Sequence, residues 1–129
     1  MDDSVRPLVA AGLVDQVESD HRISASLWLE PSPGHTPGHV CVRISSGGEE
    51  AVVSGDVMHT PLQCAAPDAR PVFDAEAAAA RAARHTFLER YADSGVVVLG
   101  THFHTPSAGK ISRAGDAYRY DPHSPSATT

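Results

Sequence analysis

The chain has 129 residues, with 10 basic residues, 16 acidic residues and eight histidines, so its formal net charge at pH 7 is −6. This length is typical of one domain, and 41% hydrophobic with 20% charged residues is the composition of a folded globular protein, not of a disordered one. The acidic balance, without a run rich in Lys and Arg, argues against nucleic acid and against an anionic membrane surface as partners.

The longest strictly aliphatic run, residues 96–99, is far shorter than the roughly 20 apolar residues of a membrane-spanning helix. The first three residues also lack the basic segment that opens a signal peptide. The two cysteines, Cys41 and Cys64, have no C-x-x-C spacing and are expected to be reduced thiols, one or both in the core. These features together predict a cytoplasmic protein.

Residues 4–18 carry apolar side chains at helical spacing after a Ser and a Pro, which predicts a short helix ending near Gly12. Residues 21–30 alternate apolar and polar side chains, as in a half-buried strand, until residues 31–34 break the pattern with Pro and Gly. The region is therefore expected to hold one helix and one strand, followed by a loop.

Residues 40–45 and 51–53 read as two strands joined by a turn at Ser46-Gly47-Gly48. The second strand runs into Ser54-Gly55-Asp56. This hairpin is expected to deliver the carboxylate of Asp56 to a loop at the end of a strand.

A long helix is predicted over about residues 74–93, with Asp74 as its N-cap, because this segment is rich in Ala. Phe87, Leu88 and Tyr91 form its apolar stripe. Residues 96–99 then read as a short strand that is covered on both faces.

The last elements are expected to be a small hairpin formed by residues 111–113 and 117–120, with a disordered tail over residues 121–129. No internal repeat or linker divides the sequence. Residues 1–120 are therefore assigned to one domain of mixed α/β (α+β) class.

Three apolar strands of the predicted fold end at once in a His or an Asp, namely His35, Asp56 and His102. If these strands are neighbours, the three side chains converge at one rim. Two imidazoles and a carboxylate are a workable ligand set for zinc or a similar divalent ion. The alternative is a small α/β protein in which the histidines are only structural, because a single loop histidine is more often a surface or hydrogen-bonded residue.

Other motifs carry less information. His102 and His104 make an H-x-H, but Pro106 and Ser107 stand where an H-x-H-x-D-H metal motif needs Asp and His. The sequence contains no G-x-S-x-G, no phosphate-binding glycine loop and no H-E-x-x-H. Three histidines in polar or exposed contexts need no function: His21, His85 and His123.

Three strings in this order, PGHTPGHV (residues 33–40), VSGDVMH (residues 53–59) and VLGTHF (residues 98–103), resemble the metallo-β-lactamase superfamily. The closer likeness is to its lactonase and organophosphate-hydrolase-like branch, and it runs from about residue 4 to residue 120. The resemblance implies an αβ/βα sandwich of two related halves with a dinuclear metal site, commonly zinc, at one edge. The chain then corresponds to the C-terminal half, a mixed sheet with one long helix.

The resemblance also implies roles for residues. His35 looks like a ligand of the first metal, Asp56 like the bridging carboxylate at the catalytic centre, and His102 like the last histidine of the second metal. His39 would support the site or pack within its loop. The remaining candidates for the substrate pocket are Met58, His59, Phe103 and His104. The implied reaction is hydrolysis of an ester, lactone, amide or phosphoester in a small-molecule substrate by a metal-bound hydroxide.

The family's H-x-H-x-D-H motif is absent from this sequence, which leaves three ligands divided between two metal positions. We therefore expect a truncated enzyme that is inactive alone. The competing hypothesis is a non-catalytic half-domain that forms a homo-oligomer or docks with a separate N-terminal half. It rests on the apolar sheet face and the strand edge that half a sandwich leaves open.

Overall fold

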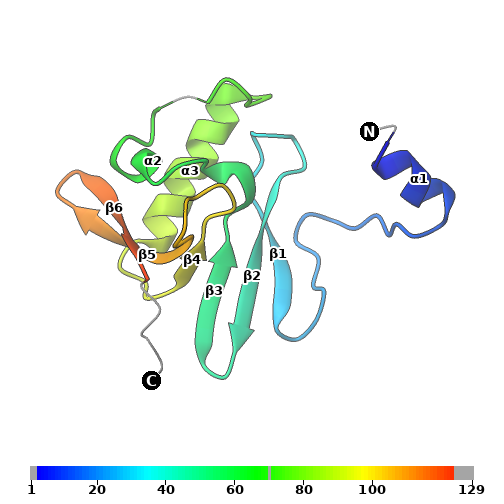
Figure 1. The fold of residues 1–129 in the computed structure, drawn as a ribbon, viewed down its shortest axis with the longest axis horizontal. Coiled ribbons are helices and arrows are strands. Elements are labelled where there is room, and N and C mark those ends of the chain that lie inside the picture. Colours follow the sequence, from blue (N-terminus) through cyan, green and yellow to red (C-terminus); the bar gives the residue numbers. More distant parts are fainter. Residues whose placement is uncertain (1–2, 70, 124–129) are drawn as a thin grey trace.

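The computed structural model describes residues 3–69 and 71–123. Within them the strands form one mixed sheet in the order β1-β2-β3-β4-β5-β6, in which only β3 and β4 run parallel (Figure 1). The strands are β1 Leu27–Pro31, β2 Val40–Ser46, β3 Glu49–Val53, β4 Val97–Leu99, β5 Ala108–Ala114 and β6 Ala117–Pro122. Antiparallel neighbours follow one another directly, whereas the parallel pair is joined through a helical crossover.

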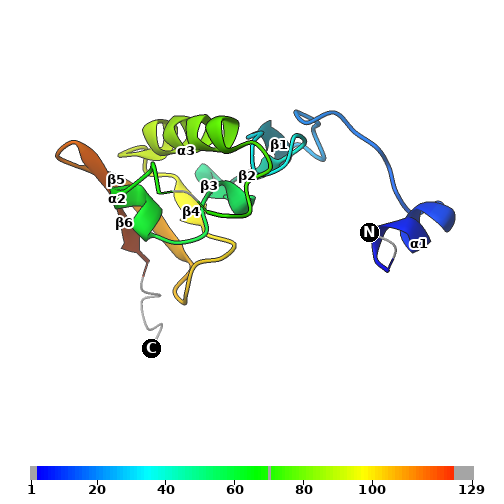
Figure 2. The same cartoon turned by 90° about the horizontal axis from the view of Figure 1, so that it is seen from above.

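The helical elements are α1 Val5–Ala10, the 3₁₀ turn η1 Gly55–Val57, α2 Leu62–Ala65 and α3 Ala77–Tyr91. Helix α3 lies along one face of the sheet (Figure 2). It packs through the predicted stripe, since Phe87, Leu88 and Tyr91 are all buried. The sheet residues in this core are Cys41, Val52, Val98, Ile111 and Tyr120.

The opposite face of β1 to β4 is aliphatic and only half-buried. The strand register places Leu29, Val42, Val53 and Leu99 in one row across the sheet. The next row on this face comprises Leu27, Ile44, Ala51 and Val97. Because side chains alternate along a strand, both rows point away from α3. The prediction that residues 96–99 are covered on both faces is therefore wrong: Val98 is buried, but Val97 and Leu99 are not.

Helix α1 stands apart from the sheet in both views (Figures 1 and 2), and none of its residues is buried. It ends just before Gly12, as the sequence predicts. Within the described part of the chain, no helix has the length and apolar character needed to cross a membrane.

Both predicted hairpins are present, as β2–β3 and β5–β6. The strand predicted over residues 21–30 begins only at Leu27, because the chain turns back at residues 23–27 through hydrogen bonds to the carbonyl of Leu27. At the other end, β6 extends through Asp121 and Pro122, which pair with β5, so the predicted tail begins too early. Residues 124–129 of that tail lie outside the described residues.

Helix α3 is shorter than the predicted 74–93. It begins at Ala77 and ends at Tyr91, and Asp74 is not its N-cap. Glu76 holds the cap position without a side-chain hydrogen bond. Both cysteines are buried and free, as predicted.

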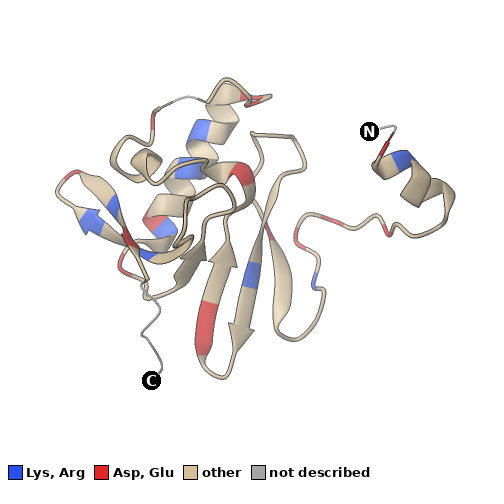
Figure 3. Ribbon diagram, in the orientation of Figure 1, with Lys and Arg blue, Asp and Glu red and all other residues tan. Residues whose placement is uncertain are grey.

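Over the described residues, basic and acidic positions are interspersed along α3 and the strands (Figure 3). The basic positions of α3 are Arg81, Arg84 and Arg90, and the acidic residues Glu49 and Glu50 open β3. This mixture fits the absence of a basic run in the sequence.

Candidate metal centre

The three side chains that follow strand ends meet at one edge of the sheet. Asp56 lies in η1 directly after β3, and His102 lies in the loop after β4. Because β3 and β4 are parallel neighbours, their carboxyl ends share an edge, where loop residues of open sheets usually form sites. His35 reaches this edge from the loop between β1 and β2. The predicted convergence is therefore present.

Asp56 is the centre of the group. Its Oδ2 lies 3.0 Å from Nε2 of His35, and its Oδ1 lies 2.9 Å from Nε2 of His102. Partial burial raises the pKa of Asp56, but the hydrogen bond and charge of His102 and the charge of His35 outweigh this effect, and the pKa is lowered. The carboxylate therefore offers a different oxygen to each histidine.

His59 joins the same group. One ligand atom from each of His35, Asp56 and His59 lies within 4.8 Å of the others. Its ring stacks on His102 with 4.8 Å between centroids and lies 5.3 Å from the ring of His35. Burial and then the charge of His102 lower the pKa of His59. Its Nδ1 is buried and has no hydrogen-bond partner among the described residues. The sequence predicts His59 only as a pocket residue, and its place beside the other ligand atoms is decided by the fold.

His39 has both ring nitrogens engaged. Its Nε2 accepts a 2.8 Å hydrogen bond from the backbone N–H of Asp56, so the proton is on Nδ1. Nδ1 lies 2.8 Å from Oγ and 3.1 Å from the carbonyl oxygen of Ser32. Burial lowers the pKa of His39, which favours this neutral form. His39 therefore holds the Asp56 turn against the loop after β1 and has no lone pair free for an ion.

Asp74 is a site neighbour that sequence reasoning missed. Its side chain is 2% exposed, and its Oδ1 lies 3.3 Å from Nδ1 of His35, on the side of the ring away from Asp56. In the sequence, an Asp shortly before an Ala-rich segment is indistinguishable from an ordinary helix cap.

Three predicted pocket residues have other positions. Met58 is fully buried against Cys64, and Phe103 is 7% exposed and packs edge-on against Tyr120, so both belong to the core and neither lines an open pocket. Their chain neighbours His59 and His102 lie at the site, whereas these two apolar side chains turn into the core.

His104 is exposed. Among the described residues, the ligand atoms within 4.8 Å of one another come from His35, Asp56 and His59, so both His102 and His104 lie outside that group. His102 adjoins it through its 2.9 Å contact with Asp56.

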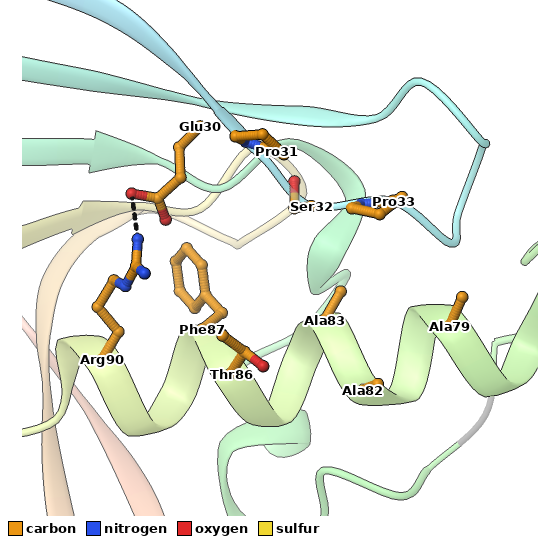
Figure 4. A pocket seen from close by; sticks show the side chains of 10 residues that line it. All are labelled: Glu30, Pro31, Ser32, Pro33, Ala79, Ala82, Ala83, Thr86, Phe87 and Arg90. Atoms are coloured by element: carbon orange, nitrogen blue, oxygen red, sulfur yellow. Dashed lines mark ion pairs between the residues drawn. The ribbon is translucent and has the colours of Figure 1, made fainter. Parts of the chain in front are cut away.

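One cavity adjoins the candidate centre, and a second, larger cavity lies away from it. A cavity of about 200 Å³ adjoins the centre and is lined by His59, Thr60, Gln63, Ala69 and Pro71. A larger one, about 320 Å³, lies between the end of β1 and α3. It is lined mainly by Pro31, Pro33, alanines and Phe87, with the Glu30–Arg90 ion pair at one end (Figure 4). The larger cavity contains none of the histidines.

The donor set fits a divalent ion. Adjacent ligand atoms on a tetrahedral zinc ion with bonds of about 2.0–2.1 Å lie roughly 3.3 Å apart. The contacts of Asp56 with His35 and His102, 3.0 Å and 2.9 Å, are close to that spacing. Imidazole nitrogen and carboxylate oxygen are both zinc ligands, and a carboxylate that presents one oxygen to each side can serve two ions.

Comparison with protein-family models and with curated proteins gives no match. Solved structures do match. AidC, a dizinc quorum-quenching lactonase in complex with the product N-hexanoyl-L-homoserine, has a TM-score of 0.81 at 21% identity over 95% of this chain. AbOPH, a hydrolase in the β-lactamase superfamily, has a TM-score of 0.87 at 22% identity, again over 95% of this chain. The chain has the fold of the metallo-β-lactamase superfamily.

A probable metal-dependent hydrolase from Staphylococcus aureus also shares the metallo-β-lactamase fold, with a TM-score of 0.69 at 20% identity over 88% of this chain. In each comparison the chain spans less than half of the matched structure, namely 46% of AidC, 43% of AbOPH and 41% of the S. aureus hydrolase. The predicted resemblance to metal-dependent hydrolases is therefore confirmed at the level of the fold.

Proposed function

We propose that this chain is part of a metal-dependent hydrolase that cleaves an ester, lactone or related bond in a small molecule. One observation carries the proposal: Asp56 directs its two oxygens to Nε2 of two different histidines, His35 and His102, at 3.0 Å and 2.9 Å. Support comes from the neighbours of the same fold, which are described as a dizinc lactonase and as hydrolases.

In this proposal His35 and Asp56 hold one divalent ion, and Asp56 and His102 hold the second. Zinc suits these nitrogen and oxygen donors. A divalent ion at this place polarises a carbonyl or phosphoryl oxygen and lowers the pKa of its bound water toward neutrality. His59 lies between His35 and His102 and is assigned to substrate contact, beside the cavity that it lines.

The number of protein ligands limits what these residues do alone. Three ligand residues shared between two ions give each ion two protein contacts, whereas catalytic zinc usually has three. We infer that further donors, from another chain or segment, complete the site, and that the isolated chain binds zinc weakly and is inactive. The cytoplasm remains the proposed location.

Zinc titration tests the metal site directly. Isothermal titration calorimetry of the 129-residue chain is expected to show zinc binding that Asp56→Ala abolishes. Asp68→Ala is the matched control, because Asp68 also contacts a histidine, at 2.7 Å from His85, but lies exposed outside the centre. Unchanged zinc binding in Asp56→Ala would contradict the proposal.

The second candidate function is a non-catalytic half-domain that associates through its sheet. The half-buried aliphatic rows on the face away from α3, centred on Val42 and Val53, favour it, since soluble proteins rarely leave large contiguous apolar surfaces open to water. Light scattering during size-exclusion chromatography is expected to give a mass above 13.6 kDa that Val42→Glu returns to the monomer value. A concentration-independent monomer would argue against it.

A further inference from the structure

Asp74 stands between a candidate ligand and a buried cation. Its Oδ1 lies 3.3 Å from Nδ1 of His35, and its Oδ2 lies 3.6 Å from Nη2 of Arg84. The side chains of both Asp74 and Arg84 are only 2% exposed. A carboxylate that served Arg84 alone would turn both oxygens to the guanidinium, whereas here one oxygen is turned to the imidazole.

Arg84 is itself fixed from several directions. It extends from α3, and its Nε donates to the carbonyl of Val57 at 3.0 Å. Its Nη1 donates to the carbonyls of Pro67 at 2.8 Å and Ala69 at 3.3 Å. One side chain from the long helix thus holds the segment that follows Asp56, and its remaining nitrogen faces Asp74. The planar, fork-shaped guanidinium makes this multiple contact, which an ammonium group could not reproduce.

The contact with Asp74 places a requirement on Nδ1 of His35. An ionised carboxylate is only an acceptor, so a hydrogen bond to Asp74 requires a proton on Nδ1 of His35. The other ring nitrogen, Nε2, lies 3.0 Å from Oδ2 of Asp56, a second acceptor-only carboxylate, and it is between these two atoms that an ion would bind. An imidazole that donates through one nitrogen to a carboxylate and offers the other to an ion is a common arrangement behind metal sites, where it fixes the tautomer and the ring orientation.

We propose that Asp74 is a positioning residue for His35: ion-paired with Arg84, it accepts a hydrogen bond from Nδ1 of His35 and keeps Nε2 directed at Asp56. The consequence for metal binding rests on the proposed function, whereas the position of the proton does not. Asp74 contacts neither an ion nor a substrate in this assignment and acts only through His35.

Proton-detected NMR of the metal-free, ¹⁵N-histidine-labelled chain tests the hydrogen bond without any metal. The wild type is expected to show a Hδ1 signal from His35 that is protected from exchange with water, because its acceptor is buried. Asp74→Ala should remove this signal. Asp56→Ala should retain it, since Asp56 contacts the other nitrogen. A His35 ring whose Nδ1 carries no proton in the wild type would overturn the proposal.

Zinc affinity separates positioning from a structural role through a double-mutant cycle. Asp74→Ala is expected to weaken zinc binding about 10-fold to 100-fold, the usual effect of removing the partner behind a metal-binding histidine. In a His35→Ala background the same substitution should have no further effect. Additive losses in the double variant would overturn the assignment. If the wild type bound no zinc, the proposed function would fail, while the NMR measurement would still decide the role of Asp74.

Two further variants serve as controls for loss of folding. Asp74→Asn keeps an acceptor oxygen for His35, so it should preserve the Hδ1 signal and recover part of the affinity that Asp74→Ala loses. Asp68→Ala removes a carboxylate that also bridges an arginine and a histidine, Arg81 at 2.6 Å and His85 at 2.7 Å, but on the exposed surface. It should change neither measurement. An Asp74→Asn chain that folds but lacks the Hδ1 signal would contradict the proposal.

Discussion

The backbone N–H of Asp56 donates a hydrogen bond of 2.8 Å to Nε2 of His39. This bond joins the turn after β3 to the loop after β1, so the two segments that carry Asp56 and His35 are held together by a residue that does not itself face the ion. The close approach also explains Gly55, where a Cβ would lie 2.6 Å from the same nitrogen.

His39→Ala is expected to lower zinc affinity about 10-fold or more, because the Asp56 turn loses its anchor. Isothermal titration calorimetry measures the change. His85→Ala provides the control, since His85 is bound to exposed Asp68 away from the centre. Equal zinc affinity in His39→Ala and wild type would show that the turn keeps its position without the anchor.

The two glycines of the PGHTPGH string, Gly34 and Gly38, should differ sharply in their tolerance of substitution by Ala. Gly34 has φ +140°, and a Cβ there would lie 2.1 Å from the backbone nitrogen of Ala80 in α3, whereas a Cβ at Gly38 meets nothing within 4 Å. Gly34→Ala is therefore expected to reduce the free energy of unfolding by about 2–4 kcal/mol through backbone strain and overpacking. Gly38→Ala should stay within about 0.5 kcal/mol. Urea unfolding of both variants tests this, and similar midpoints would contradict it.

Tyr91→Phe should destabilise the packing of α3 on the sheet. The Tyr91 hydroxyl donates to the carboxylate of Glu30 at 2.9 Å and accepts from Arg43 at 3.1 Å. Removing it leaves partly buried charged groups without this partner, at a cost of about 1–3 kcal/mol. Thermal unfolding measures the loss. Tyr118→Phe is the matched control, because Tyr118 contacts Arg113 through its ring. Equal melting temperatures for the two variants would argue against a stabilising network.

The two thiols are expected to be unreactive in the folded protein. Burial raises the pKa of Cys41 and of Cys64 from 9.0 to about 11, so thiolate at pH 8 is about 100-fold scarcer than in an unfolded chain. A chromogenic aryl disulfide should therefore react with both cysteines only as fast as the protein opens. The same reagent in denaturing urea provides the fast reference rate. A fast-reacting thiol under native conditions would contradict the expected burial.

The same pKa shifts predict a loss of stability in alkali. The folded state keeps its thiol protons to a higher pH than the unfolded state, so this contribution is complete below about pH 9 and falls as the pH rises through about 11. Melting temperatures measured between pH 8 and pH 11 should therefore decline. Replacing Cys64 by Ala should make the decline of melting temperature with pH shallower. An unchanged decline would show that other titrating groups cause it.

Much of the fold follows from local sequence patterns. Alternation and the Ser46-Gly47-Gly48 turn are sufficient to place the β2–β3 hairpin, and the Ala-rich segment with Phe87, Leu88 and Tyr91 is sufficient to place α3. The predicted strand over residues 21–30 is too long, because alternation cannot reveal that the chain folds back onto the carbonyl of Leu27.

The candidate metal centre is likewise predicted only in part by the sequence. The sequence by itself determined that His35, Asp56 and His102 each follow a strand, since a strand end is a local property. Only the tertiary structure decided which nitrogen meets which oxygen, that His59 joins them, and that Met58 and Phe103 turn into the core. It also showed that Asp74, which the sequence predicts as a helix cap, instead contacts Nδ1 of His35. These contacts join residues tens of positions apart. The pairing of β3 with β4 and the packing of α3 against the sheet bring them together, and a local sequence pattern encodes neither.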